Sequence, residues 1–234
     1  MKAMILAAGE GRRMRPLTYV KPKPLLEVAG RPLIEHHLAR LSAAGFSEIV
    51  VNVSHLGHQL VDFLGDGSQW RVAIAISVEQ TPLDTAGGII QALPRLGDAP
   101  FLLVNGDVFT DYPLAQLRET APFERGAHIV LVPNPKHHPL GDFALQGNRV
   151  GQLPSIETVI GDQMVVTYSG IGVYDPALFA NSAPGRRPLK PLLDEAMARA
   201  SLSGELYEGT WEDVGTPQRL AALNQKFPSD SASQ

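Results

Sequence analysis

The sequence predicts an α/β fold, with one domain built on a mixed, mostly parallel central sheet that is flanked by helices. Two observations carry this prediction. Short apolar runs alternate with amphipathic stretches in the first half of the chain, and the links between them are short. Strand and helix in turn, joined by short links, are typical of a sheet covered on both faces. The 234 residues, of which 44% are hydrophobic, suffice for one full core.

In the first half, apolar runs without a helical period predict buried strands, and apolar residues that recur every three or four positions predict helices. Gly45 stands where the first helix is expected to stop, and Ser54 is expected to cap the second. The strands are predicted at residues 2–8, 48–53, 71–78 and 101–105. The helices are predicted at residues 33–44, 56–64 and 85–93.

The second half is less regular. Gly147 and Asn148 separate two short apolar runs, which predicts a two-residue hairpin turn. Strands are predicted at residues 126–132, 143–146, 149–153, 164–174 and 206–211, and helices at 192–200 and 217–227. No repeat or linker divides the chain, so we expect one domain over residues 1–227. The polar tail, 228–234, has no aromatic residue and is expected to be disordered.

The composition narrows the possible functions. A net charge of −4 and a pI of about 6.0 argue against an extended nucleic-acid surface. The absence of cysteine excludes disulfides, thiolate catalysis and cysteine-ligated zinc. No apolar run approaches the about 18 residues of a membrane span, and the run at residues 3–9 is too short for a signal peptide. We therefore expect a cytoplasmic protein that binds neither nucleic acid nor membrane.

A glycine-rich segment follows the first predicted strand. Gly9 and Gly11, one residue apart, permit a tight turn that presents backbone N–H groups to a phosphate. Met14 stands where the dinucleotide fingerprint would need a third glycine, and the Gly-Lys-Ser/Thr of a P-loop is absent. The glycines alone are also consistent with a plain strand-to-helix turn.

A basic cluster beside these glycines favours a polyphosphate site over a plain turn. Its five members, out of 20 cationic residues in an acidic chain, are Arg12, Arg13, Arg15, Lys21 and Lys23. Prolines on both sides of Lys23 restrict the backbone and hold the lysine in a fixed direction. A preorganised cation of this kind stabilises the charge that grows on a transferring phosphoryl group.

These segments resemble the signature of the sugar-1-phosphate nucleotidylyltransferases. The matching segments are LAAGEGRRMRPLT at residues 6–18, KPKPLL at 21–26 and GRPLI at 30–34. The resemblance implies a Rossmann-like nucleotidyltransferase fold in which Ala8, Gly9 and Gly11 lie along the nucleotide. It also implies that Arg13 grips the triphosphate and Lys23 the reacting phosphate, which makes these two the expected catalytic residues. Arg12 and Arg15 fall at positions where the family varies.

Two aspartates match the family's metal-binding pair. Asp107 follows a predicted strand in Asn105-Gly-Asp107, at the edge where open α/β sheets place ligands. Asp213 lies in Trp211-Glu-Asp-Val-Gly-Thr-Pro217, ahead of a predicted helix. Taken alone, either carboxylate could instead cap a helix or support a turn. Mg²⁺ is commonly held by one or two carboxylates plus substrate phosphates, so the resemblance implies Mg²⁺ bound by Asp107 and Asp213.

The resemblance also implies positions for the base and the sugar. Glu79 falls where the family reads the base, and an ionised carboxylate accepts hydrogen bonds, which suits uracil or guanine. The loop from Thr85 to Gly88 is also consistent with an ordinary helix start. The residues implied for the sugar, together with a lysine that could bind its phosphate, are Asn105, Gly141, Glu157, Tyr168 and Lys190.

Two departures from the family pattern bear on the sugar. Thr158 stands where a lysine commonly follows the glutamate, and Tyr168-Ser-Gly170 replaces Asn-Ala-Gly. These departures and the short chain make the sequence most similar to the N-acetylmuramate 1-phosphate uridylyltransferase subgroup, which implies UTP and a place in cell-wall sugar recycling. GTP with mannose 1-phosphate, or TTP or UTP with glucose 1-phosphate, stays open.

The expected reaction is an in-line displacement that needs no general base, because the sugar phosphate is already ionised near neutral pH. Catalysis then depends on alignment and on cancelling charge. A catalytically silent nucleotide-binding homologue would commonly lack one of the site residues, whereas Arg13, Lys23, Asp107 and Asp213 are all present. The expected partners are small-molecule substrates, in a monomer or a weak homo-oligomer. His137 and His138 lie in a loop that flanks the expected sugar site; they could touch substrate, but loop histidines are more often solvated.

Overall fold

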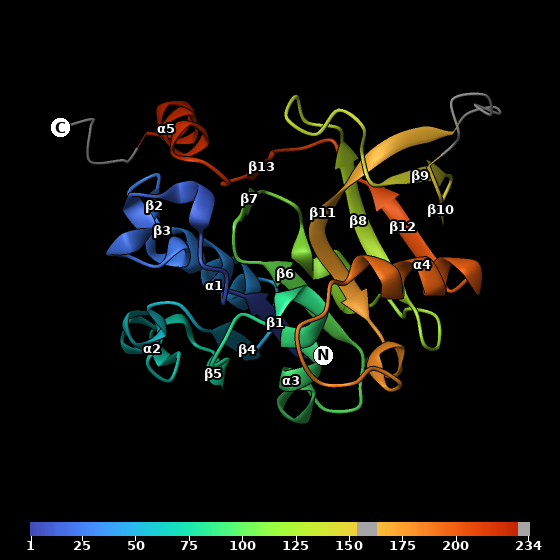
Figure 1. The fold of residues 1–234 in the computed structure, drawn as a ribbon, viewed down its shortest axis with the longest axis horizontal. Coiled ribbons are helices and arrows are strands. Elements are labelled where there is room, and N and C mark those ends of the chain that lie inside the picture. Colours follow the sequence, from blue (N-terminus) through green and yellow to red (C-terminus); the bar gives the residue numbers. More distant parts are fainter. Residues whose placement is uncertain (154–162, 229–234) are drawn as a thin grey trace.

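The computed structural model describes residues 1–153 and 163–228, and these residues centre on a nine-stranded sheet (Figure 1). Its strand order is β5-β4-β1-β6-β11-β8-β12-β10-β9, with β5 at the left of Figure 1 and β9 and β10 at the right. The strands of the described residues are β1 (Ala3–Leu6), β2 (Glu27–Val28), β3 (Arg31–Pro32), β4 (Glu48–Val53), β5 (Ala73–Val78), β6 (Phe101–Asn105), β7 (Val108–Thr110), β8 (Ala127–Pro133), β9 (Phe143–Gln146), β10 (Arg149–Gly151), β11 (Met164–Tyr174), β12 (Leu202–Leu206) and β13 (Trp211–Asp213).

Helices cover both faces of this sheet. The α-helices are α1 (Leu33–Ala43), α2 (Gly57–Leu64), α3 (Asp84–Leu96), α4 (Lys190–Ala198) and α5 (Pro217–Lys226). Six short 3₁₀ helices join them in the described residues: η1 (Arg12–Met14), η2 (Leu17–Tyr19), η3 (Lys23–Leu25), η4 (Ser68–Trp70), η5 (Leu114–Arg118) and η6 (Pro176–Phe179). None of the helices in this described part is long and apolar enough to cross a membrane.

The sheet is mixed, as predicted, but it is not mostly parallel: among the described strands four pairings are parallel and five are antiparallel. β1 pairs in parallel with β4 and with β6, and β4 pairs in parallel with β5. The long strand β11 runs antiparallel to β6, β8 and β9, and so joins the regular first half of the chain to the second half. β8 and β12 pair in parallel beyond it.

Two apolar cores lie on opposite faces of the sheet because side chains alternate along each strand. On β1, Met4 belongs to the core under α3 and α4, whereas Ala3 and Ile5 belong to the core under α1 and α2. All three of these side chains are fully buried. Each core position of this kind contributes about 1.5–3 kcal/mol when a large apolar side chain is buried, so the two faces fix how β1 and its neighbours are placed.

A third, smaller core brings the two ends of the chain together. Met14 and Val28 of the amino-terminal segment pack with Val214, just after β13, and with Leu223 of α5. Asn224 on α5 accepts from the N–H of Ala29 and donates to the carbonyl of Glu27. Figure 1 shows α5 beside β2 and β3 accordingly. This packing accounts for Met14 in the glycine-rich segment, because its side chain is a core residue.

Two predictions about elements were wrong, and two strand pairs were missed. Residues 206–211 do not form one strand; β12 ends at Leu206 and β13 starts at Trp211. Ser54 does not cap α2, since Leu56 holds the N-cap position and makes no side-chain capping bond. The pairs β2–β3 and β7–β13 were not predicted. The tail predicted at 228–234 lies, apart from Pro228, outside the described residues.

Candidate active site

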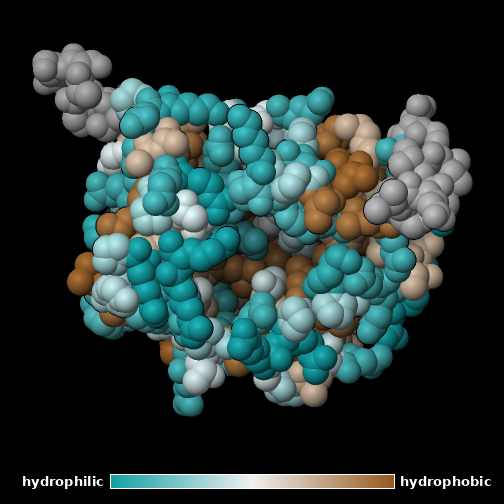
Figure 2. All heavy atoms as spheres, turned by 45° about the horizontal axis from the view of Figure 1, so that its top comes forward, coloured by the Kyte–Doolittle hydropathy of each residue, from teal (hydrophilic) through white to brown (hydrophobic). Residues whose placement is uncertain are grey.

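A cavity of about 350 Å³ opens at the carboxyl ends of β1 and β6. Open α/β sheets commonly bind ligands at this edge, because loops diverge there and leave a crevice. Figure 2 shows the hollow on this face, with apolar side chains at its bottom and hydrophilic side chains at the rim. Eight of the predicted site residues line the cavity: Ala8, Gly9, Gly11, Arg13, Lys23, Glu79, Asn105 and Asp107.

The glycine-rich loop forms one wall of the cavity. Gly11 has a φ of +61°, and a Cβ there would lie 2.8 Å from the methyl of Thr18 and 3.4 Å from Cβ of Lys23. The Thr18 hydroxyl donates to the Gly11 carbonyl over 2.8 Å, and the N–H of Met14 donates to the same carbonyl. Glycine is therefore required at position 11, whereas Gly9 has open space around it.

Lys23 reaches across the cavity to Asp107. Its Nζ lies 2.6 Å from Oδ2 of Asp107, and its side chain is only 11% exposed. Burial would raise the pKa of the Asp107 carboxyl, but the Lys23 ammonium outweighs that effect and holds the pKa below its usual value. The carboxylate is therefore ionised at neutral pH and available to a cation.

Asp107 and Asp213 lie on neighbouring segments, although 106 residues separate them. The N–H of Val214 donates to the Asp107 carbonyl over 2.8 Å, and Asp213 is paired with Val108 in the β13–β7 ladder. Gly215, the next residue but one, lines the cavity with Asp107. The structure thus places the two predicted metal ligands on adjoining segments, with Asp107 lining the cavity and Asp213 just outside its lining.

Asp213 already has two partners that the sequence did not indicate. Its Oδ1 accepts from Nη1 of Arg219 on α5 and lies 2.8 Å from Nε2 of His137. The expectation that His137 is a solvated loop residue was therefore wrong. His138 is also engaged, because its Nε2 lies 3.0 Å from Oδ1 of Asp142. No local motif marks these contacts, since Arg219 and His137 meet only through the packing of α5 against the loop after β8.

Glu79 is buried at the base of the cavity and fixed on both oxygens. Its Oε1 accepts from Nδ2 of Asn52 over 2.7 Å, and its Oε2 accepts from the N–H of Leu83 over 2.9 Å. Asn52 is oriented in turn by the N–H of Ala7, which donates to its Oδ1. Burial raises the pKa of the Glu79 carboxyl, against the opposing effect of these two hydrogen bonds. The residue predicted to face the base is thus rigidly held.

Asn105 lines the cavity and carries a buried acceptor that is unsatisfied among the described residues. Within the part of the chain that the structure describes, its buried Oδ1 has no hydrogen-bond partner. Its side chain packs on Gly170, where a Cβ would lie 2.6 Å from Nδ2 of Asn105. A buried acceptor without a partner costs free energy, so a donor such as a ligand hydroxyl is favoured beside it.

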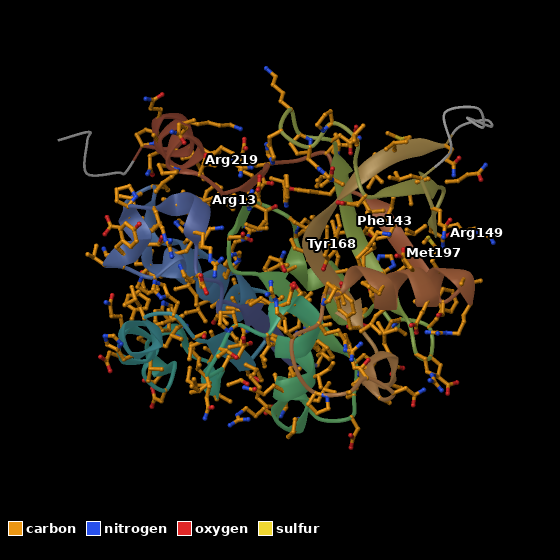
Figure 3. The ribbon with its side chains drawn as sticks, viewed as in Figure 1. Arg13, Phe143, Arg149, Tyr168, Met197 and Arg219 are labelled. Carbon is orange, nitrogen blue, oxygen red and sulfur yellow. The ribbon has the colours of Figure 1, made fainter. Side chains whose placement is uncertain are left out.

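The other residues predicted for the sugar do not line this cavity. Gly141 precedes Asp142 in the chain. Oδ2 of Asp142 accepts from the backbone N–H of Tyr168 on β11. The Tyr168 hydroxyl is hydrogen-bonded to that of Tyr174, so it faces the core rather than the cavity. Lys190 pairs with Asp194 one turn along α4 and lies over the ring of Phe143; Figure 3 shows Phe143 and Tyr168 in the second half of the sheet. Glu157 lies outside the described residues.

Metal binding at this edge would need ligands from outside the chain. Among residues 1–153 and 163–228, no group of three or more histidine and carboxylate side chains is arranged to hold a metal ion. Two aspartates on adjoining segments nevertheless provide oxygen donors, which hard divalent cations prefer. Such an ion would complete its coordination with phosphate oxygens and water.

Comparison with known proteins agrees with this geometry. A family model described as nucleotidyl transferase matches residues 2–230. The N-acetylmuramate alpha-1-phosphate uridylyltransferase of Neisseria meningitidis serogroup B is 50% identical over 94% of this chain and 95% of its own length. A mannose-1-phosphate guanyltransferase of Aspergillus oryzae is 33% identical over 93% of this chain and 62% of its own length.

The fold also has a match among solved structures. A structure from Bacillus anthracis, described as a glucose-1-phosphate thymidylyltransferase in complex with a sucrose, aligns with a TM-score of 0.81. The alignment covers 97% of this chain and 95% of that one, at 23% identity. At this level of identity the likeness shows a common fold.

Proposed function

Because the chain belongs to the nucleotidyl transferase family, we propose that it transfers a uridylyl group from UTP to N-acetylmuramate α-1-phosphate and releases pyrophosphate. The observation that carries the proposal is that the glycine-rich loop, Lys23 and Asp107 share one cavity at the sheet edge. The 50% identity to a uridylyltransferase over nearly the whole chain supports the choice of sugar and base.

The nucleotide would occupy the wall formed by the glycine-rich loop. Ala8, Gly9 and Gly11 bring backbone to the cavity surface, and the exposed Arg13 can reach a triphosphate there. At the far side, Glu79 keeps lone pairs beyond those used by Asn52 and Leu83. A carboxylate oxygen accepts more than one hydrogen bond, so it suits the N3–H of uracil.

The donor set fits Mg²⁺. Asp107 is ionised and Asp213 is the adjoining carboxylate, and both offer oxygen ligands. When bound, Mg²⁺ would neutralise charge on the reacting phosphates. The chain itself supplies the two carboxylates, and Lys23 supplies a further cation at the same place.

The proposed step is an in-line displacement. An oxygen of the sugar phosphate forms a bond to the α-phosphorus, and the bond from that phosphorus to the bridging oxygen breaks. Pyrophosphate leaves with the electron pair. Lys23 stabilises the charge on the α-phosphate and Arg13 that on pyrophosphate, so the residues act by alignment and electrostatics rather than by proton transfer.

The sugar would lie on the side of β11. The unsatisfied Oδ1 of Asn105 suits a sugar hydroxyl. Gly141 stays a candidate from the sequence, and its protein neighbours Asn134 and Val166 already require a glycine there. Tyr168, Lys190 and Glu157 stay candidates from the sequence; the Tyr168 hydroxyl is engaged with Tyr174, and Lys190 is paired with Asp194. The proposed setting is the cytoplasm, in the recycling of cell-wall sugars, with small molecules as partners.

Pyrophosphate release from a panel of substrates tests this proposal. Each of UTP, GTP and TTP would be combined with N-acetylmuramate α-1-phosphate, glucose 1-phosphate and mannose 1-phosphate in the presence of Mg²⁺. We expect the highest kcat/KM for UTP with N-acetylmuramate α-1-phosphate. Preference for GTP with mannose 1-phosphate would change the proposed substrates but leave nucleotidyl transfer as the reaction. No release of pyrophosphate from any pair would contradict the proposed function.

A further inference from the structure

Arg219 occupies the carboxylate that is proposed to bind the metal. Its Nη1 donates to Oδ1 of Asp213, and Nε2 of His137 lies 2.8 Å from the same oxygen. Arg219 Nη1 and His137 Nε2 are themselves 2.6 Å apart. Two side chains therefore crowd one carboxylate oxygen, and a divalent ion that bound there would have to displace at least one of them.

The guanidinium of Arg219 also lies against Gly215, a residue of the cavity wall, although Arg219 itself does not line the cavity. A Cβ on Gly215 would be 1.9 Å from Nη2 of Arg219, so the guanidinium rests directly on the Gly215 backbone. Gly215 lines the cavity with Lys23 and Asp107. Figure 3 shows Arg219 extending from α5, whose first turn is fixed where the Thr216 hydroxyl accepts from the N–H of Arg219. The cation is thus held within reach of a phosphate in the cavity.

The local charges form two matched pairs. Lys23 is paired with Asp107, and Arg219 is paired with Asp213. The Arg219 side chain is only 21% exposed. A mostly buried guanidinium that loses its carboxylate costs free energy unless another anion replaces it. The anions that enter this cavity in the proposed reaction are substrate phosphates.

We propose that Arg219 is a positioning residue that makes metal and phosphate binding depend on each other: it holds Asp213 when the metal is absent and binds a substrate phosphate when the metal takes Asp213. The proposal rests on the proposed function for the identity of the phosphate. The metal and Arg219 compete for Oδ1 of Asp213. The guanidinium that the metal releases then pairs with a substrate phosphate. Metal binding alone is then opposed by Arg219, whereas phosphate binding with metal present is favoured by it.

The first test measures Mn²⁺ binding by titration calorimetry, without nucleotide or sugar. Arg219→Gln removes the competing charge but keeps a polar side chain, so we expect Mn²⁺ to bind about tenfold more tightly than to the wild-type chain, within the range of a coupling between two sites. Arg219→Lys keeps the charge and should bind Mn²⁺ as the wild-type chain does. Lys226→Gln is the matched control, since Lys226 lies on the same helix and pairs with Glu212; it should change the affinity less than twofold.

The second test measures N-acetylmuramate α-1-phosphate with Mn²⁺ and an unreactive UTP analogue present. Arg219→Gln should weaken its binding about tenfold, while Lys226→Gln should not. The two effects of one substitution thus have opposite signs. A role of Arg219 in folding alone would weaken both, and thermal unfolding of each variant reports that role directly.

Three results would overturn the proposal. These are Mn²⁺ binding to Arg219→Gln that equals or falls below that of the wild-type chain, failure of both chains to bind Mn²⁺ at millimolar concentration, and unchanged binding of the sugar phosphate. The Mn²⁺ arm uses no substrate, so it decides the competition at Asp213 even if the substrate panel contradicts the proposed function. Turnover by the wild-type chain together with equal Mn²⁺ affinities would overturn only the role of Arg219.

Discussion

Two neighbouring hydrogen-bond donors explain why residue 79 is a glutamate. The side chain is 3% exposed, and its two oxygens face two donors, the amide of Asn52 and the N–H of Leu83. Asn52 cannot turn its amide, because its Oδ1 accepts from Ala7. Two fixed donors need two acceptors. A carboxylate has both and an amide has only one, so glutamate fits this position where glutamine does not.

We therefore expect Glu79→Gln to lower the free energy of unfolding by about 1–2 kcal/mol, because one buried donor then faces the new NH₂ group. The loss is reduced because glutamine carries no charge into the buried site. Urea denaturation at pH 7 measures the change. Glu10→Gln is the control, because Glu10 pairs with the exposed side chain of Arg12. Equal stability of Glu79→Gln and the wild-type chain would show that the two donors do not require a carboxylate.

The proposed reaction depends most strongly on the side chain of Lys23. We expect Lys23→Ala to keep the fold and to lower kcat by about 10²–10³, the scale of losing one preorganised electrostatic donor. Lys21→Ala is the control, because Lys21 belongs to the same basic cluster but is half-exposed and pairs with Glu27. Steady-state kinetics and circular dichroism check the result. An unchanged kcat would remove Lys23 from the mechanism.

At the scale of elements, a bulge in β11 positions one side of the site. The register with β8 shifts between Tyr168 and Ile171, and Gly170 in the bulge has a φ of +81°. Trp211 on β13 donates to the carbonyl of Ser169 in the same bulge. The irregularity therefore connects β11 with β13 and packs Gly170 against Asn105. Bulges commonly re-aim a side chain in this way.

Gly170→Ala is expected to destabilise the fold by about 1–3 kcal/mol, through its positive φ and its overlap with Asn105. It should also raise the KM for the sugar phosphate, because Asn105 must move. Gly147→Ala is a close control: Gly147 has a φ of +60° but nothing within 4 Å of its Cβ position. If both variants show equal losses of stability and equal KM values, the contact with Asn105 has no effect.

Periodic elements were predicted from the sequence far better than short ones. The strands at 48–53, 101–105 and 164–174 were predicted with the bounds that the structure shows. In contrast, β7 and β13 have three residues each, too few for any period to appear, and their pairing joins segments about 100 residues apart. Helix bounds differed by one to three residues at most ends, because capping bonds depend on neighbours that the sequence does not reveal.

At the scale of the whole molecule, the fold determines which charged residues meet. Motifs indicated Lys23 and Asp107, which the structure brings to 2.6 Å. Arg219 and His137 carry no motif, and their contact with Asp213 follows only from the packing of α5 and of the loop after β8. Sequence patterns therefore predicted the groups that meet in the cavity better than those that surround the second aspartate.

The buried His37 makes the stability of the whole molecule depend on pH. Burial lowers its pKa from 6.5 to about 4, because the charged ring would lose its hydration. Below pH 6.5 the unfolded chain binds a proton at His37 that the folded chain does not bind. The contribution of His37 to stability is therefore complete above pH 6.5 and is lost as the pH falls toward 4, by about 3 kcal/mol in all.

We expect His37→Gln to reduce the loss of unfolding free energy as the pH falls. Urea denaturation at pH 7, 5 and 4 should show that the wild-type chain loses about 3 kcal/mol more than His37→Gln over this range. The two chains are compared by the change in their unfolding free energy with pH. A loss of packing in the variant that is the same at every pH therefore does not affect the result. His58→Gln, at an exposed position, should retain the full dependence. Parallel curves for His37→Gln and the wild-type chain would show that His37 does not carry it.

The central claim is that residues from the first strand to the last helix meet at one metal and one triphosphate. Anomalous scattering from Mn²⁺ in crystals grown with a UTP analogue, unreactive between its α- and β-phosphates, tests it most directly. The account predicts one Mn²⁺ peak bound by the carboxylates of Asp107 and Asp213, with Lys23 Nζ on the α-phosphate. A peak bound by neither aspartate, or a triphosphate outside the cavity beside Gly11, would contradict it.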